Sequence, residues 1–227
     1  MQTGDTIIKD KQSAAEFDLQ ARKTDWHGPE VVFGLTYELV KPGESVLDLG
    51  IGSGLSSILF HRAGLRVYGL DGSSEILAVC AEKGFAVELK QHDLRDVPLP
   101  YSSSFFDHVL SVAVLNSFQD LSGLFKEVAR IVKQPGIFAF TVEEQKPGQA
   151  DAYAINRVQV SEKPNVESAV TLFRHRADYI ARLLDHNDFV LLKTLEFLAF
   201  RYPAENRDVF FKAYVAQKHM AHPSSRL

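Results

Sequence analysis

The chain has 227 residues, of which 45% are hydrophobic, so it can form one domain with a substantial core. Its formal net charge of −4 disfavours a broad nucleic-acid-binding surface, and no apolar run approaches the roughly 20 residues that a membrane-spanning helix needs. The single cysteine, Cys80, cannot form an internal disulfide, and the N-terminal residues lack the segments of a signal peptide. We therefore expect a cytoplasmic protein whose partners are small molecules or proteins, without nucleic acid, a membrane span or a metal site.

The first 40 residues predict a helical segment that precedes the core. Residues 1–25 are mostly polar, and we expect a flexible start that leads into a short helix. Between Glu30 and Val40 the apolar residues recur at helical spacing, and Lys41-Pro42-Gly43 ends that helix. We divide the chain into an N-terminal helical cap segment at 1–40, a core at 41–218 and a flexible tail at 219–227.

Strands and helices then alternate. An apolar strand at 45–49 runs into three alternate glycines, Gly50, Gly52 and Gly54. The elements expected after them are a helix at 55–63, a strand at 66–70, a helix at 73–83, strands at 85–90 and 105–112, a helix at 121–132 and a strand at 137–142. This alternation predicts an α/β fold with a largely parallel sheet, which binds ligands beyond the carboxyl ends of its strands.

The regular pattern breaks at residues 144–175, which we interpret as a lid-like insertion over the site. A last helix is predicted around residues 179–184 and ends near Asn187. Two β-rich runs, 189–200 and 208–217, follow it and predict an antiparallel terminal strand pair.

Three features lie at predicted strand ends, and each has two interpretations. The alternate glycines let a ligand approach the backbone, or they only form a tight turn. Asp71 follows the second strand, where its carboxylate can accept two hydrogen bonds from a ribose diol or cap the next helix. Asp93 follows the third strand, where it can receive an exocyclic amine or serve as a turn residue.

The glycine stretch resembles a known motif. Val46-Leu47-Asp48-Leu49-Gly50-Ile51-Gly52-Ser53-Gly54 is similar to the first motif of class I S-adenosylmethionine-dependent methyltransferases, and closest to the ubiquinone/menaquinone-biosynthesis-like small-molecule branch. Residues 30–143 follow the order of this family, with further matches at Asp71, His92-Asp93-Leu94, Phe105-Phe106-Asp107 and Lys133-Gln134-Pro135-Gly136. The resemblance implies a three-layer Rossmann-like methyltransferase fold, with a mostly parallel seven-stranded sheet and an antiparallel C-terminal strand pair.

The same resemblance implies an activity and a cofactor. The chain would bind S-adenosyl-L-methionine and transfer its methyl group by in-line displacement to O, N or C of a small-molecule acceptor, leaving S-adenosyl-L-homocysteine. In that family Asp71 would hold the ribose, Asp93 and Leu94 would read adenine, and Asp48 would brace the loop and the cofactor's amino group, or only hold the turn. The cofactor-binding residues that it implies are Asp48, Gly50, Ile51, Gly52, Gly54, Asp71, Gly72, Asp93, Leu94, Ser111 and Val112.

The acceptor site has fewer indications. We expect Trp26, Asn116 and Phe118 to line it, since the segment 111–118 follows the fourth strand. The family often has a histidine-containing stretch there, whereas this chain has Leu115-Asn116-Ser117-Phe118. A base is required only if the acceptor must lose a proton during attack, and the candidates for it are His27 and His175. The alternative for both is a surface or packing histidine.

Two other functions use the same sequence features. A nicotinamide-dependent oxidoreductase also has a glycine turn and a terminal acid, but Leu55 stands where the spacing Gly-x-Gly-x-x-Gly requires glycine. A non-catalytic S-adenosylmethionine-binding protein would keep the cofactor residues and fill the acceptor space. Nucleic-acid methylation is disfavoured, since no Asn/Asp-Pro-Pro-aromatic stretch follows the fourth strand.

Overall fold

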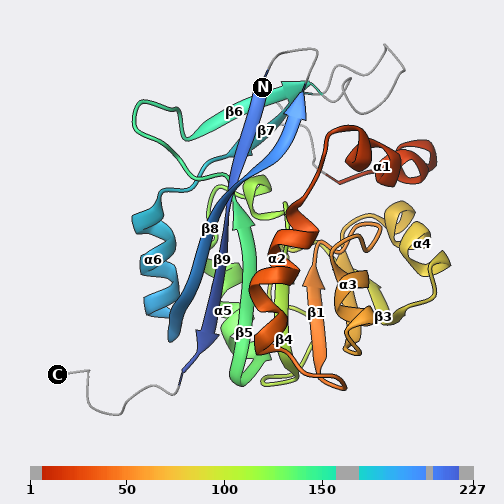
Figure 1. Cartoon of the computed structure of the whole chain (residues 1–227), viewed down its shortest axis with the longest axis vertical. Coiled ribbons are helices and arrows are strands. Elements are labelled where there is room, and N and C mark those ends of the chain that lie inside the picture. The colour runs from red at the N-terminus through yellow and green to blue at the C-terminus, as the bar shows by residue number, and fades with distance from the viewer. Residues whose placement is uncertain (1–6, 157–168, 203–206, 220–227) are drawn as a thin grey trace.

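The computed structural model describes residues 7–156, 169–202 and 207–219. In it, helices pack on both faces of a seven-stranded sheet, which gives three layers (Figure 1). The strands of this sheet are β1 (Ser45–Leu49), β2 (Arg66–Asp71), β3 (Ala86–Gln91), β4 (Phe106–Ser111), β5 (Val132–Val142), β8 (Phe189–Tyr202) and β9 (Arg207–Lys218). The helices are α1 (Lys11–Lys23), α2 (Gly28–Thr36), α3 (Ser57–Arg62), α4 (Ser74–Glu82), α5 (Ser122–Ile131) and α6 (Ala177–His186), with the short 3-10 helices η1 (Tyr37–Leu39) and η2 (Leu115–Ser117).

The strand order places a crevice at β1. The sheet runs β3-β2-β1-β4-β5-β9-β8, with β1 to β5 parallel and β9 antiparallel to both of its neighbours. This confirms the expected fold class, including the antiparallel C-terminal pair. From β1 the chain first adds β2 and β3 on one side of the sheet and then β4 and β5 on the other side. The direction in which strands are added therefore reverses at β1, and open α/β sheets bind ligands at such a point.

Alternating side chains fill the two faces of the sheet. In β5, Phe138 and Phe140 point to the face that α5 covers, where both rings lie edge-on against Phe125. Ile137 and Ala139 point to the opposite face, toward the cluster that includes helices α2, α3 and α4. Strands buried on both sides in this way read as continuous apolar runs.

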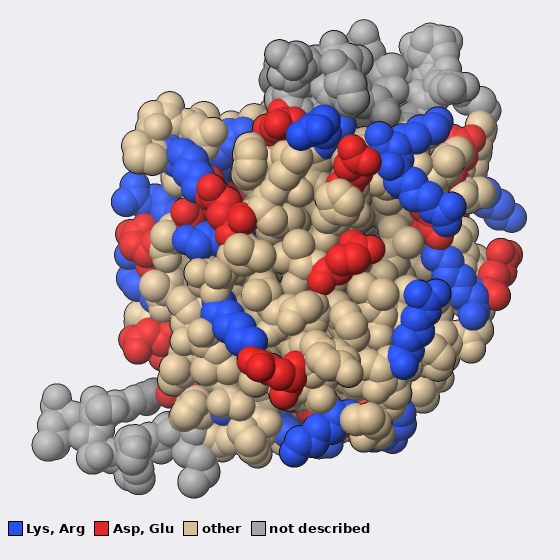
Figure 2. Space-filling view, viewed as in Figure 1, with Lys and Arg blue, Asp and Glu red and all other residues tan. Residues whose placement is uncertain are grey.

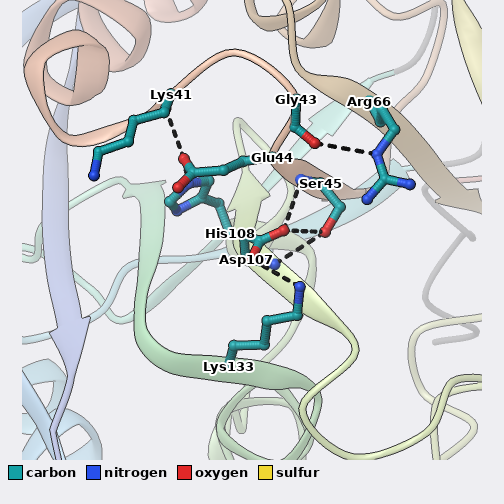
Figure 3. A network of polar contacts seen from close by, with 8 residues as sticks. All are labelled: Lys41, Gly43, Glu44, Ser45, Arg66, Asp107, His108 and Lys133. Carbon is teal, nitrogen blue, oxygen red and sulfur yellow. Dashed lines mark hydrogen bonds and ion pairs between the residues drawn. The ribbon is translucent and has the colours of Figure 1, made fainter.

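A polar network ties the amino ends of the strands together, at the edge opposite the crevice (Figure 3). Asp107 accepts hydrogen bonds from the Ser45 backbone N–H (2.8 Å) and hydroxyl (2.7 Å), and its second oxygen pairs with Lys133 Nζ at 2.8 Å. Burial opposes ionisation, but Lys133 and Ser45 outweigh it and lower the pKa of Asp107 to about 2. Asp107 therefore serves to join the starts of β1, β4 and β5.

Three parts of the chain differ from the predicted elements. The helix expected at 30–40 begins at Gly28 and ends as the 3-10 turn η1. Strand β5 already begins at Val132, since Val132 pairs with Phe106 before a register shift. The insertion contains an antiparallel two-stranded sheet of β6 (Ala152–Asn156) and β7 (Ala169–Phe173), which the weak pattern did not predict.

Some predictions fall on segments that lie outside the described residues, namely 157–168 of the insertion and 220–227 of the tail. In the described part of the chain, no helix is both long and apolar enough to cross a membrane. Acidic and basic side chains are interspersed around the face shown in Figure 2, and the centre of that face is mainly uncharged.

Candidate active site

The glycine loop after β1 is folded back over the end of β2. The backbone N–H groups of Gly50 and Ile51 both donate to Leu70 O, at 2.8 and 3.0 Å. Gly50 has a φ of +72°, and a Cβ there would lie 2.5 Å from Val114 Cγ2. Gly52 has a φ of +55°, also in the left-handed region. The loop therefore needs glycine at both positions, for conformation and, at Gly50, for space.

Asp71 lies beside this loop at the end of β2. One carboxylate oxygen accepts from the Gly52 N–H and the other from the Ser73 N–H, each at 2.9 Å. Burial raises the pKa of Asp71, while these N–H groups oppose that change. The N-cap of α4 is Ser73, whose hydroxyl accepts from the Ile76 N–H, so Asp71 is not needed as the cap.

A cavity of about 390 Å³ opens at this edge of the sheet, where the ends of β1, β2, β3 and β4 meet. Its size suits a small organic ligand, since such sites commonly enclose about 300–1,000 Å³. It brings together ten of the predicted residues: Trp26, Gly50, Ile51, Gly52, Asp71, Gly72, Asp93, Leu94, Val112 and Phe118.

Asp93 is engaged by a residue that the sequence analysis missed. Arg95 Nε lies 2.9 and 3.0 Å from the two Asp93 carboxylate oxygens, and the Arg95 N–H donates to one of them at 2.9 Å. The guanidinium outweighs the burial of Asp93 and lowers its pKa. Both residues line the cavity, so a carboxylate and a guanidinium lie together at its β3 side.

Besides the two histidines, four predicted residues do not line the cavity, and two of these four support the glycine loop from behind. Asp48 is buried in β1 and accepts a hydrogen bond from the Ser57 hydroxyl of α3, and burial raises its pKa to about 7. Gly54 has a φ of +86°, and a Cβ there would lie 2.5 Å from Phe85 Cζ. These positions match the structural interpretation of Asp48 and a packing role for Gly54.

The other two are Ser111, at the end of β4, and Asn116, in the 3-10 helix η2 that follows. The hydroxyl of Ser111 is buried and donates to Leu49 O at 3.3 Å, which links β4 to the end of β1. Asn116 is buried in η2, and its side-chain oxygen lacks a hydrogen-bond partner among the described residues.

Neither histidine lies on the cavity. His27 is exposed and precedes the first turn of α2. His175 is buried, with its Nε2 3.1 Å from Leu115 O and its ring stacked on Tyr179, and burial lowers its pKa. Both positions match the surface and packing alternatives.

Helix α1 forms a wall of the cavity that was not predicted. The helix residues Phe17, Gln20 and Ala21 and the C-cap residue Thr24 lie at helical spacing and face the cavity together. The helix is attached to the glycine loop through Asp18, which accepts the Ser53 hydroxyl and pairs with Lys83 Nζ at 2.6 Å. Lys83 also donates to Ser53 O at 2.7 Å. This three-residue contact, the α1 latch, holds the helix against the loop and α4.

Comparison with known proteins agrees with this geometry. Residues 47–140, from β1 to β5, match the family model described as a methyltransferase domain. This part of the chain is therefore similar to a methyltransferase domain. The match covers the glycine loop, Asp71 and Asp93, and it does not support the nicotinamide-dependent alternative.

Curated relatives match part of their length. The chain is 37% identical over 114 residues to a demethylmenaquinone methyltransferase of Bacillus mycoides, and the match covers 48% of each protein. It is 27% identical over 158 residues to a malonyl-[acyl-carrier protein] O-methyltransferase of Serratia marcescens, or 66% of this chain and 61% of that one. The chain thus spans about half the length of the curated relatives it matches.

Solved structures share the fold over most of the chain. An S-adenosylmethionine-dependent methyltransferase of Methanosarcina mazei superposes with a TM-score of 0.68 at 18% identity, covering 82% of this chain and 98% of that one. A second structure is the Haloferax volcanii complex of the Trm112 methyltransferase activator with a methyltransferase. It matches with a TM-score of 0.69 at 20% identity, covering 93% of this chain and 97% of that one.

Proposed function

We propose that this chain binds S-adenosyl-L-methionine and transfers its methyl group to a small-molecule acceptor. The observation that carries the proposal is the convergence of the glycine loop, Asp71 and Asp93 on one cavity of a methyltransferase domain. The cofactor supplies a sulfonium-activated methyl group, so the protein's task is to position donor and acceptor. Aligned positioning contributes about 7–11 kcal/mol to such reactions.

The lining residues fit the parts of this cofactor. Asp71 offers a carboxylate at the end of β2, where two ribose hydroxyls can donate to it. The bare backbone at Gly50 and Gly52 leaves room for the methionine part. Asp93 and Leu94 line the cavity one strand further along the sheet, and in this proposal they read the adenine edge.

The acceptor half of the cavity is apolar. Its residues include Trp26, Val114, Phe118 and Phe200, whereas the charged residues among the described lining are Asp71, Asp93 and Arg95 at the ends of β2 and β3. We therefore propose transfer without a protein base among the described residues. The relatives named above act on a demethylmenaquinone and on a malonyl-[acyl-carrier protein], and their names support an organic acceptor here too.

Calorimetric titration tests the cofactor directly. We expect the purified chain to bind S-adenosyl-L-homocysteine and not NADH. Incubation with methyl-labelled S-adenosylmethionine and a small-molecule extract is then expected to give a labelled organic product. Binding of NADH without S-adenosylhomocysteine would refute the proposal, and cofactor binding without any labelled product would favour the non-catalytic alternative.

The α1 latch is expected to control the escape of the cofactor. Lys83→Met removes the charge that joins Asp18 to the loop and keeps a side chain of similar length. Since a partly buried charged hydrogen bond is lost, we expect dissociation of S-adenosylhomocysteine to become about 10-fold faster. Stopped-flow measurement of the dissociation rate checks this. Arg182→Met breaks an exposed ion pair on α6 and should leave the rate unchanged, and equal rates for both variants would contradict a latch.

A further inference from the structure

Trp26 forms a wall of the cavity together with the C-terminal strands. Its ring stacks on Phe200 of β8, with centroids 4.6 Å apart and planes 14° apart, and meets Phe211 of β9 edge-on at 6.1 Å. The backbone supports this contact, because the Arg201 N–H donates to Thr24 O at 3.1 Å. Trp26 and Phe200 both line the cavity, so segments from the two ends of the chain build one aromatic wall.

The ring of Trp26 lies on Gly28, the first residue of α2. A Cβ at Gly28 would lie 2.1 Å from Trp26 Cη2 and 2.2 Å from Cζ2, distances that real contacts do not reach. Gly28 is not among the residues with positive φ, so its backbone conformation is open to any residue. Alanine would favour the helix more than glycine does. Space for the indole is therefore the feature of this position that requires glycine.

We propose that Gly28 is a positioning residue for the acceptor, which sets the width of the apolar half of the cavity by seating Trp26 against Phe200. The inference rests on the proposed function and deepens it. A methyl group at this position would displace the indole, because the ring is confined by Phe200 and Phe211 on its other sides. The ligand surface that this wall accepts is uncharged and apolar, since no charged residue lines it within the described part of the chain.

Trp26 is the single tryptophan of the chain, so its fluorescence reports the position of the wall. We expect Gly28→Ala to shift the emission of Trp26 and to change its quenching by acrylamide. The affinity for S-adenosylhomocysteine should stay within about 3-fold, because Asp71 and the glycine loop are untouched. Binding of 2-naphthol, used as an apolar probe of the protein saturated with S-adenosylhomocysteine, should weaken about 10-fold through the loss of aromatic contact.

Gly34→Ala is the matched control, because it makes the same change in the same helix where a Cβ meets nothing within 4 Å. It should leave the fluorescence and 2-naphthol binding unchanged. Adding Trp26→Phe to Gly28→Ala puts a smaller ring at the crowded position and should recover most of the 2-naphthol affinity.

Two results would overturn the inference. One is unchanged fluorescence and unchanged 2-naphthol affinity in Gly28→Ala. The other is a wild-type protein that binds S-adenosylhomocysteine and does not bind 2-naphthol, because the aromatic wall would then not be a binding surface. Failure of the wild type to bind S-adenosylhomocysteine would instead refute the proposed function, so the two failures are distinguishable.

Discussion

Asp71→Ala is expected to weaken the binding of S-adenosylhomocysteine by at least about 100-fold without unfolding the domain. Each hydrogen bond to a charged group contributes about 1.5–3 kcal/mol, and the proposed ribose contact contains two. The substitution also leaves the Gly52 and Ser73 N–H groups without their carboxylate partner, so the glycine loop loses a support next to the ligand. Calorimetry gives the affinity, and circular dichroism gives the folded state.

Asp107→Ala is the matched control for this experiment. Asp107 also accepts a backbone N–H, from Ser45, but at the opposite edge of the sheet (Figure 3). Its loss should lower the melting temperature and leave the affinity for S-adenosylhomocysteine unchanged. Equal losses of affinity in both variants would mean that Asp71 acts through the stability of the domain and not through the ribose.

The core of the fold could be predicted because its strands and helices carry local signals. β1 is buried along its whole length with apolar residues at three of its five positions, and Ser73 caps α4 with its own side chain. The early start of β5 at Val132 could not be predicted, since Gln134-Pro135-Gly136 is typical of a turn and only pairing with β4 extends the strand. Among the described residues, the strands β6 and β7 pair only with each other, and residues 157–168 separate them in the sequence. Neither strand therefore follows the strand–helix alternation from which the other strands were predicted.

The cofactor side of the site was more predictable than the acceptor side for a related reason. Gly50, Asp71 and Asp93 lie at or just after the ends of three strands, and the topology of the sheet brings these ends to one edge. The wall around Trp26 depends on Phe200, which is remote in sequence and becomes a neighbour only when β8 is in place. Arg95 was within reach of sequence reasoning, because it lies two residues from Asp93 and can fold back onto it.

Asp48 is expected to make the stability of the protein depend on pH. Burial raises the pKa of Asp48 from 3.8 to about 7 in the folded state, with the charge of nearby Asp71 adding to the increase and the Ser57 hydroxyl opposing it. The folded state therefore holds this proton more tightly than the unfolded state does. The stabilisation is present in full below about pH 4, falls as the pH rises and is lost above about pH 7.

Asp48→Asn should remove this loss, because asparagine is similar in size, does not titrate and can still accept the Ser57 hydroxyl. The interval between a pKa of 3.8 in the unfolded chain and about 7 in the folded protein sets an upper limit of about 4 kcal/mol for the gain in unfolding free energy above pH 7. Urea unfolding of both proteins between about pH 4 and pH 8 measures it. The two curves should meet at the acidic end and separate as the pH rises, and parallel curves would show that Asp48 ionises in the folded protein without cost. Ser57→Ala sharpens the test, since removing the donor should raise the folded-state pKa of Asp48 further and extend the fall in stability to higher pH.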